Sequence, residues 1–230
     1  MLDNMKQYKH LIIVFCLLFL VGCGWVPPWE YYYAKSFIAC YCGGELYADD
    51  SKDGVQIYWK FRQQEYSHES WGKDKEIYKQ LCEKHNDIGY NEWEVDRRDL
   101  DAGDFNYRMV YWKDFVAIDV LSDRDFDIAH PAGTSLGDVV AYWGISYWDW
   151  VKSGYSLRDE NGVRQTRTIE EGYLNNIPEE GLCLIEELSL HFPFVPESAV
   201  GEHNLTITIT ADDGTVYNLG CTVLLDATEE

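Results

Sequence analysis

The stretch Leu205–Leu225, LTITITADDGTVYNLGCTVLL, decides the fold class of this chain. In its first half, leucine or isoleucine alternates with threonine, and this period of two predicts a β-strand with one apolar face. In its second half, every second residue from Tyr217 onward is apolar or a cysteine, which predicts another strand of the same kind. Two such strands so close in the sequence predict an antiparallel hairpin.

The register of this hairpin follows from its apolar faces. They coincide only if Ile209 lies opposite Tyr217, because a slip of one residue would bury Asn218 instead. This register leaves a three-residue loop, Asp212-Asp213-Gly214. The third residue of such a loop takes a positive φ, which glycine adopts without steric cost. The face pattern and the position of the glycine therefore predict the same loop.

Three upstream segments also carry strand patterns, after Gly54, within 105–120 and within 182–190. In each, apolar residues recur at short spacings that suit a half-buried strand. The residues concerned are Val55, Ile57, Trp59, Phe61, Phe115, Ala117, Ile118, Val120, Leu182, Leu184, Leu188 and Leu190.

Helical spacing occurs in three short segments. Residues 74–85 place five side chains on one stripe of an amphipathic helix. Ser135 caps a second expected helix over 135–143, and a third is expected to run from Trp148 to a stop at Gly154. The stripe residues are Ile77, Tyr78, Leu81, Cys82 and His85 in the first helix, and Leu136, Val139, Val140 and Trp143 in the second.

A polar hairpin is expected to follow the third helix. Asn161-Gly162 is typical of a type I′ turn, which would pair Asp159 with Arg164. Thr168–Glu171 has the composition of a cap and predicts another short helix before Pro178.

Strands therefore dominate the expected structure, with no internal repeat or low-complexity tract. The pattern predicts a mainly β fold, an antiparallel β-sandwich with two or three short helices. Residues 36–230 are expected to form a single domain, with a weak boundary near residue 113. A body of this length can bury a sizeable core.

The N-terminus carries a different pattern. Two lysines precede the apolar run Leu11–Leu20, and small residues close the run before Cys23. This length and basic head predict a secretory signal peptide, because the run is too short to span a bilayer. Whether Met1 or Met5 begins the chain stays open.

The residues Leu20-Val21-Gly22-Cys23 resemble the lipobox of bacterial lipoproteins. The resemblance implies a signal peptide over 1–22, cleavage before Cys23, lipidation of the Cys23 thiol and a membrane tether over 23–35. Two or more acyl chains, at about 0.8 kcal/mol per buried methylene, hold a protein at a bilayer. Attachment to the outer membrane facing the periplasm is expected, with the cell surface as the alternative.

The run that begins at Val116, with its SDRDFDIAHPAGTSLGD, resembles uncharacterised small lipoproteins of the Bacteroidetes, and so does the closing hairpin. The resemblance implies an immunoglobulin-like β-sandwich in the cell envelope. It implies no activity.

The composition is strongly acidic, with 40 Asp and Glu against 19 Lys and Arg and a net charge of −21. Removal of residues 1–22 takes away two lysines and one aspartate, so the mature chain carries −22. Such a charge repels nucleic acid and excludes roles that depend on phosphate contacts. It suits cations, basic partners or colloidal solubility.

Five cysteines lie beyond the lipobox. An exported chain meets an oxidising compartment, so one or two disulfides are expected, and the odd number leaves at least one thiol unpaired within the chain. A bridge from Cys40 or Cys42 to Cys82 is the expected pairing. Cys183 and Cys221 complete the set.

Asp123, Asp125 and Asp127 alternate, and an extended segment would place their three carboxylates on one face. Hard oxygen ligands in this arrangement suit calcium, the only cofactor that the sequence suggests. A solvated loop without a metal is the alternative.

A dense aromatic cluster contains Trp148 and Trp150. Exposed aromatic rings can stack on sugars, so both are candidate ligand-binding residues. Places in the hydrophobic core are the alternative.

The sequence contains no nucleophile elbow, zinc-protease motif or phosphate-binding loop, so no residue is assigned a catalytic role and no enzyme is predicted. We expect a lipid-anchored envelope protein that binds or scaffolds, with the membrane and a glycan or protein as partners. The alternative is a protein that binds or hydrolyses glycans with acidic and aromatic residues.

Overall fold

The computed structural model describes residues 30–51, 54–59, 64–96 and 108–228. The chain divides into two compact units, Met1–Tyr32 with Trp93–Asn106, and Tyr33–Glu92 with Tyr107–Glu230. Strands β1 (Glu30–Ala34) and β6 (Glu92–Asp96) pair as a two-stranded sheet, so part of the expected tether is a strand.

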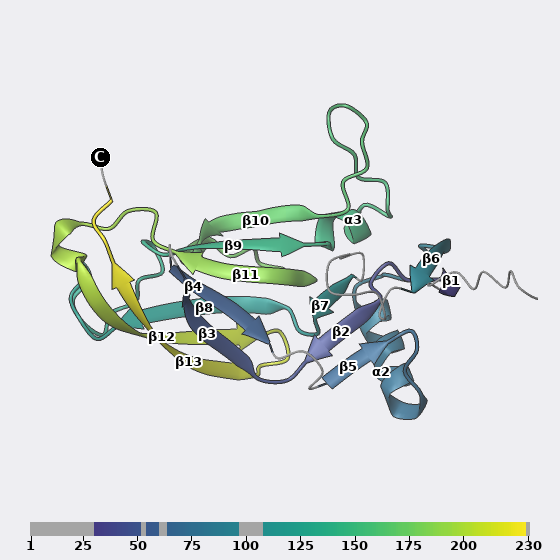
Figure 1. Cartoon of the computed structure of the whole chain (residues 1–230), viewed down its shortest axis with the longest axis horizontal. Coiled ribbons are helices and arrows are strands. Elements are labelled where there is room, and N and C mark those ends of the chain that lie inside the picture. Colours follow the sequence, from purple (N-terminus) through teal and green to yellow (C-terminus); the bar gives the residue numbers. More distant parts are fainter. Residues whose placement is uncertain (1–29, 52–53, 60–63, 97–107, 229–230) are drawn as a thin grey trace, which may run out of the picture. The chain divides into compact units, whose positions relative to one another are not determined.

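Strands make up 45% of the structure and helices 14%, which confirms a mainly β fold. The largest sheet has five antiparallel strands in the order β10-β9-β11-β4-β3 (Figure 1). Its strands are β3 (Leu46–Ser51), β4 (Gly54–Trp59), β9 (Ala141–Ser146), β10 (Thr168–Tyr173) and β11 (Ile185–His191).

The C-terminal hairpin forms as predicted, within an antiparallel sheet of order β13-β12-β8. Its strands are β8 (Phe115–Ser122), β12 (Gly201–Ala211) and β13 (Val216–Leu225). Ile209 pairs with Tyr217, which confirms the register. Gly214 has φ 82°, and its N–H donates to the carbonyl oxygen of Ala211 at 2.9 Å.

One hydrophobic core joins these two sheets. Ile207 and Ile209 of β12 are completely buried, and they belong to the same cluster as Val55 and Ile57 of β4. Leu188 and Leu190 of β11, in the larger sheet, belong to the same cluster. Most of the predicted strand residues therefore meet in one core. Ala117 is exposed, Leu184 is buried outside this cluster, and Phe61 lies outside the described residues.

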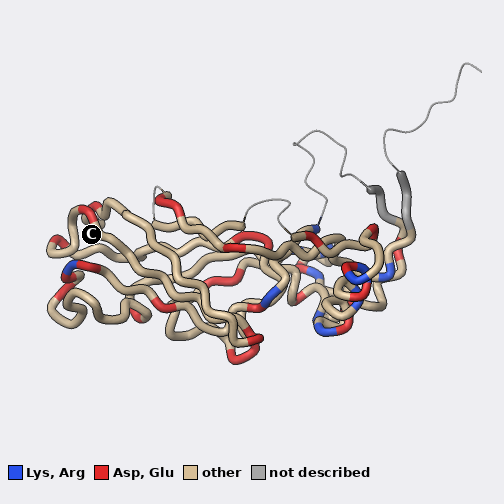
Figure 2. Tube along the Cα trace, turned by 90° about the horizontal axis from the view of Figure 1, so that it is seen from below, with Lys and Arg blue, Asp and Glu red and all other residues tan. Residues whose placement is uncertain are grey.

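A third sheet has the order β5-β2-β7, from β2 (Cys40–Gly43), β5 (Gln64–Ser67) and β7 (Met109–Tyr111). Strand β2 is antiparallel to β5 and parallel to β7. Helix α2 (Gly72–Lys84), predicted over 74–85, covers one face of this sheet. The ring of Tyr78 packs 6.0 Å from that of Tyr41, and its hydroxyl donates to the carbonyl oxygen of Ile38. Figure 2 shows basic residues concentrated near α2 and acidic residues spread along the rest of the described chain.

The second predicted helix, over 135–143, is wrong. Residues 136–140 form a single turn, in which the N–H of Val140 donates to the carbonyl oxygen of Leu136, and β9 begins at Ala141. Strand β9 pairs with β10 on one side and β11 on the other, so ladder hydrogen bonds on both edges override the local helical period. The helix expected from Thr168 is also wrong, because those residues form β10, an edge strand that pairs with β9.

The third predicted helix is confirmed as α3 (Trp148–Lys152), followed by Gly154 at φ 64°. The type I′ turn after it is wrong. Asp159 pairs with Val163 rather than Arg164, and its Oδ1 accepts the N–H groups of Asn161 and Val163. This side-chain cap favours a loop one residue longer than the I′ turn.

No disulfide forms among the described cysteines, and Cys40, Cys42, Cys82, Cys183 and Cys221 are free thiols. Side chains alternate along β2, so Tyr41 points toward α2, where Cys82 lies, and Cys40 and Cys42 point to the opposite face. The expected bridge to Cys82 is therefore prevented by the orientation of the strand.

We predict that Gly214→Val lowers the free energy of unfolding by about 1–2 kcal/mol, because a β-branched residue is strained at positive φ. A Cβ at this position meets no atom within 4 Å, so the cost is purely conformational. Gly220→Val, on β13, is the control: a Cβ there meets only the carbonyl oxygen of Leu205 at 4.0 Å, so it should change stability much less. Equal denaturant midpoints for Gly214→Val and the wild type would contradict the loop geometry.

Candidate functional site

The predicted lipidation site, Cys23, lies outside the described residues. Among the residues that are described, no helix is both long enough and apolar enough to cross a bilayer.

The three aspartates of the predicted calcium site lie in the segment after β8, and each accepts a hydrogen bond from a different backbone N–H group. Asp123 accepts hydrogen bonds from the N–H and the side-chain amide of Asn204, at 2.9 and 2.7 Å, and these bonds lower the pKa of Asp123. Asp125 accepts the N–H of Ala132 at 2.8 Å. Asp127 accepts the N–H of Ala129 at 2.8 Å.

His130 completes this loop between two carboxylates. Its Nδ1 lies 2.8 Å from Asp127 Oδ1, and its Nε2 lies 3.0 Å from Asp138 Oδ1. The hydrogen bond to Asp127 raises the pKa of His130 above its ordinary value. Within the described ranges, no group of three or more His, Cys, Asp or Glu side chains is placed to hold a metal ion.

The two candidate tryptophans lie in different surroundings. Trp150 is 1% exposed; its ring centroid lies 5.8 Å from that of Phe37, and the guanidinium of Arg164 lies 4.4 Å above it. Trp150 is therefore part of the core in this structure. Trp148 is half-buried, and its indole N–H donates to Glu180 at 3.4 Å.

Acidic side chains gather around Trp148 at one end of α3. Glu180 accepts a hydrogen bond from Lys152, which lowers the pKa of Glu180. The pKa of Glu170 on β10 is raised, first by burial and then by the charges of Asp149 and Glu180. The pKa values of these two carboxyl groups are therefore shifted in opposite directions.

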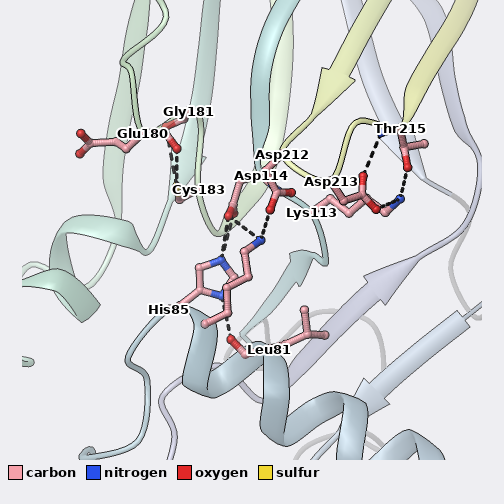
Figure 3. A network of polar contacts seen from close by, with 11 residues as sticks. Leu81, His85, Lys113, Asp114, Glu180, Gly181, Cys183, Asp212, Asp213 and Thr215 are labelled. Carbon is pink, nitrogen blue, oxygen red and sulfur yellow. Dashed lines mark hydrogen bonds and ion pairs between the residues drawn. The ribbon is translucent and has the colours of Figure 1, made fainter.

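A second polar network joins α2 to the C-terminal hairpin (Figure 3). His85, which follows α2, places Nε2 3.0 Å from Asp114 Oδ1 and Nδ1 2.9 Å from the carbonyl oxygen of Leu81. Lys84 bridges Asp114 and Asp212, at 2.7 and 2.9 Å. Burial acts to raise the pKa of Asp114, but the hydrogen bond and charge of His85 and the charge of Lys84 hold it below its ordinary value.

The hairpin loop is fixed to the same segment by further bonds. The N–H of Asp212 donates to the carbonyl oxygen of Asp114 at 3.0 Å, and the N–H of Asp114 donates to Asp212 Oδ1 at 3.2 Å. Lys113 donates to Thr215 Oγ1 and pairs with Asp213, and the hydrogen bond from Lys113 lowers the pKa of Asp213 to about 2. The network is therefore a structural clamp.

Cys183 adds a thiol beside this clamp, so that Cys, His and Asp occur together. Burial raises the pKa of the Cys183 thiol, and its S–H donates to the carbonyl oxygen of Glu180. The two nitrogens of His85 lie against the carbonyl oxygen of Leu81 and the carboxylate of Asp114. The Cys183 thiol is directed at the carbonyl oxygen of Glu180 and not at either of these nitrogens, whereas a nucleophile is hydrogen-bonded to its general base.

The outer face of the five-stranded sheet is the other candidate site. We define it by the residues that alternate with the core-facing ones. The register of the strands defines a row across all five: Glu171 pairs with Trp143, Trp143 with Ser189, Ser189 with Gln56, and Gln56 with Asp49. The outer face comprises Tyr47, Asp49, Ser51, Gln56, Tyr58, Trp143, Ile145, Ile169, Glu171, Tyr173, Glu187, Ser189 and His191.

The outer face, as these described residues define it, combines aromatic rings with carboxylates and has no lysine or arginine. The rings of Tyr47 and Tyr58 stack with centroids 5.6 Å apart, and the hydroxyl of Tyr58 donates to Asp49 at 2.8 Å. Ile169 is 62% exposed and Tyr173 41%. The sequence pattern did not predict this face, because the local spacing placed Trp143 and Thr168–Glu171 in helices.

A scan against protein-family models, a search of curated proteins and a search of solved structures each find no match to this chain. The site therefore has to be interpreted from its geometry alone.

We predict that Asp114→Asn lowers the free energy of unfolding by about 3 kcal/mol, because it removes the carboxylate charge that the buried partners in the clamp face. The pKa of Asp114 is lower in the folded state, so its contribution is present above the ordinary value of 3.8 and is lost as the pH falls through the folded-state pKa. Urea titrations from pH 2 to pH 7 measure this. The free energy of unfolding lost in Asp114→Asn should be largest at neutral pH and should shrink in acid. A loss that is independent of pH would contradict the prediction. Glu160→Gln, at an exposed loop, is the control.

Proposed function

We propose that this protein is a lipid-anchored protein of the bacterial cell envelope, whose β domain binds a ligand and has no catalytic role. The anchor is supported by the short apolar run, its basic head and the lipobox-like residues that end at Cys23. We place the lipid in the outer membrane with the domain facing the periplasm, and assign the fold to the immunoglobulin-like sandwiches.

The outer face of the five-stranded sheet supports the binding role. The row of Glu171, Trp143, Ser189, Gln56 and Asp49 sets an aromatic ring among hydrogen-bonding groups, on a rigid scaffold of five strands. Aromatic rings bind apolar C–H surfaces, and carboxylates accept strong hydrogen bonds from hydroxyl groups. A sugar presents both features, so the ligand that this face suits best is a glycan.

Charge narrows the class of glycan. Asp49, Glu171 and Glu187 are carboxylates of the outer face, and the mature chain carries a net charge of −22 after the signal peptide is removed. An anionic polysaccharide would be repelled by both the local and the overall charge. We therefore propose a neutral polysaccharide as the ligand.

Glycan hydrolysis is a second candidate function, favoured by the acidic side chains around Trp148. Glycosidases use one carboxyl that holds its proton and one that stays ionised. The raised pKa of Glu170 and the lowered pKa of Glu180 follow this division.

We predict that Cys23→Ala abolishes membrane attachment. A chain without this thiol cannot receive the acyl chains, so the mutant should move from the detergent phase to the aqueous phase in phase partitioning, or keep its signal peptide. Cys221→Ala is the control, because this thiol lies on β13. Equal partitioning of Cys23→Ala and the wild type would remove the basis for the anchor.

We predict that the protein binds neutral polysaccharides on an array in preference to uronic-acid or sulfated ones. Trp143→Ala should weaken this binding at least tenfold, which corresponds to about 1.4 kcal/mol. Trp71→Ala is the matched control, since Trp71 is 90% exposed and lies outside the outer face. A preference for anionic polysaccharides, or equal binding by the two variants, would contradict the proposal.

The same samples separate binding from hydrolysis. A binding protein leaves the polysaccharide intact, so no new reducing ends should form on prolonged incubation. Release of reducing ends that disappears in Glu170→Gln would favour hydrolysis instead.

A further inference from the structure

Three sulfur-bearing side chains lie on one face of the three-stranded sheet β5-β2-β7. Cys40 and Cys42 are two residues apart on β2, so both point to the face away from α2, and their Sγ atoms are 3.8 Å apart. Met109 of β7 is the parallel partner of Cys40, and paired residues share a face of the sheet. We call Cys40, Cys42 and Met109 the sulfur cluster.

The geometry of β2 works against a disulfide within this cluster. Residues two apart on a strand have Cα atoms about 6.6 Å apart, near the upper limit for a disulfide. A strand held between two partners cannot shorten without losing its ladder, because β2 pairs with β5 on one edge and β7 on the other. Cys40 and Cys42 are 0% and 2% exposed, so neither is positioned to pair with another chain.

The same separation suits a metal ion between the two sulfurs. Two metal–sulfur bonds of about 2.3 Å across a gap of 3.8 Å enclose an angle of about 110° at the metal. This angle lies between the tetrahedral and trigonal values. A third ligand from the neighbouring strand would therefore complete a three-coordinate site.

The ligand types select the metal. Thiolates and thioethers are soft ligands that favour Cu(I), whereas a thioether is a poor ligand for zinc, which prefers thiolate, imidazole or carboxylate. The residues beside the cysteines on the neighbouring strands include Ser67, Glu65 and Tyr111. Met109 pairs with Cys40 across β2 and β7, so its thioether is the soft third ligand that the register of the sheet places beside the cysteines.

We propose that the sulfur cluster binds one Cu(I) ion through the Cys40 and Cys42 thiolates and the Met109 thioether. Each thiol loses its proton as its sulfur bonds to the metal, so binding releases two protons to solvent, and the thioether donates a lone pair. Copper enters and stays as Cu(I), so no electron is transferred. The site carries a net charge of −1, and its two cysteines are buried from water.

Proton release makes binding depend on pH. Each thiol gives up its proton when its sulfur binds the metal, so proton release is part of the binding equilibrium. The apparent affinity for Cu(I) should therefore rise with pH.

The test is a Cu(I) titration of the full-length lipidated protein in detergent, under anaerobic and thiol-free reducing conditions, against a chromophoric Cu(I) chelator. We expect one Cu(I) per chain and a hundredfold or greater loss of affinity in the Cys40→Ser, Cys42→Ser double variant. Cys183→Ser is the matched control, since it removes another buried thiol from a different part of the fold and should leave binding unchanged.

Met109→Leu keeps the volume of the side chain and removes only the sulfur, so it tests the third ligand even if the double variant fails to fold. We expect its affinity to fall at least tenfold while its melting temperature stays near that of the wild type. Copper-edge absorption spectra of the wild type should show three sulfur neighbours, and those of Met109→Leu two. No Cu(I) binding, binding unchanged in Met109→Leu, or a preference for Zn(II) would each overturn the proposal.

Discussion

The burial of one face of β12 is the constraint on which the rest of the structure depends. Its alternating apolar residues pack against the five-stranded sheet, while its two edges pair with β8 and β13. Because the register is fixed by that face, the loop after β12 places Asp212 beside Asp114. Lys84 and His85 at the end of α2 then reach the same carboxylate, so the position of the helix follows from the register of the hairpin.

The parts of this architecture that were predictable from the sequence are those governed by local rules. The hairpin loop follows from Gly214 and the alternation beside it, and α2 follows from one apolar stripe. Strand β9 was not predictable in this way, because its residues fit a helical period and only pairing with two distant strands makes them extended. The clamp was missed for a similar reason, since Asp114 lies 29 residues from His85 and 98 from Asp212.

Period-two alternation also connects the two proposed sites. On the five-stranded sheet it divides each strand between the core and the outer face, so Trp143 is available to a ligand while its neighbour Tyr142 is 3% exposed. On β2 it directs Tyr41 to the helix and both cysteines to the other face. The direction of the two cysteine side chains thus decides between the disulfide expected with Cys82 and the metal site proposed with Met109.

Strand β10 ends the five-stranded sheet, so the backbone groups along its outer edge have no ladder partner within that sheet. Unpaired edges of this kind can pair between two copies of a protein and join them edge to edge. Glu170 and Glu171 occupy the middle of this strand. Two copies aligned antiparallel would bring these carboxylates into opposition, and the resulting repulsion keeps crowded neighbours separate.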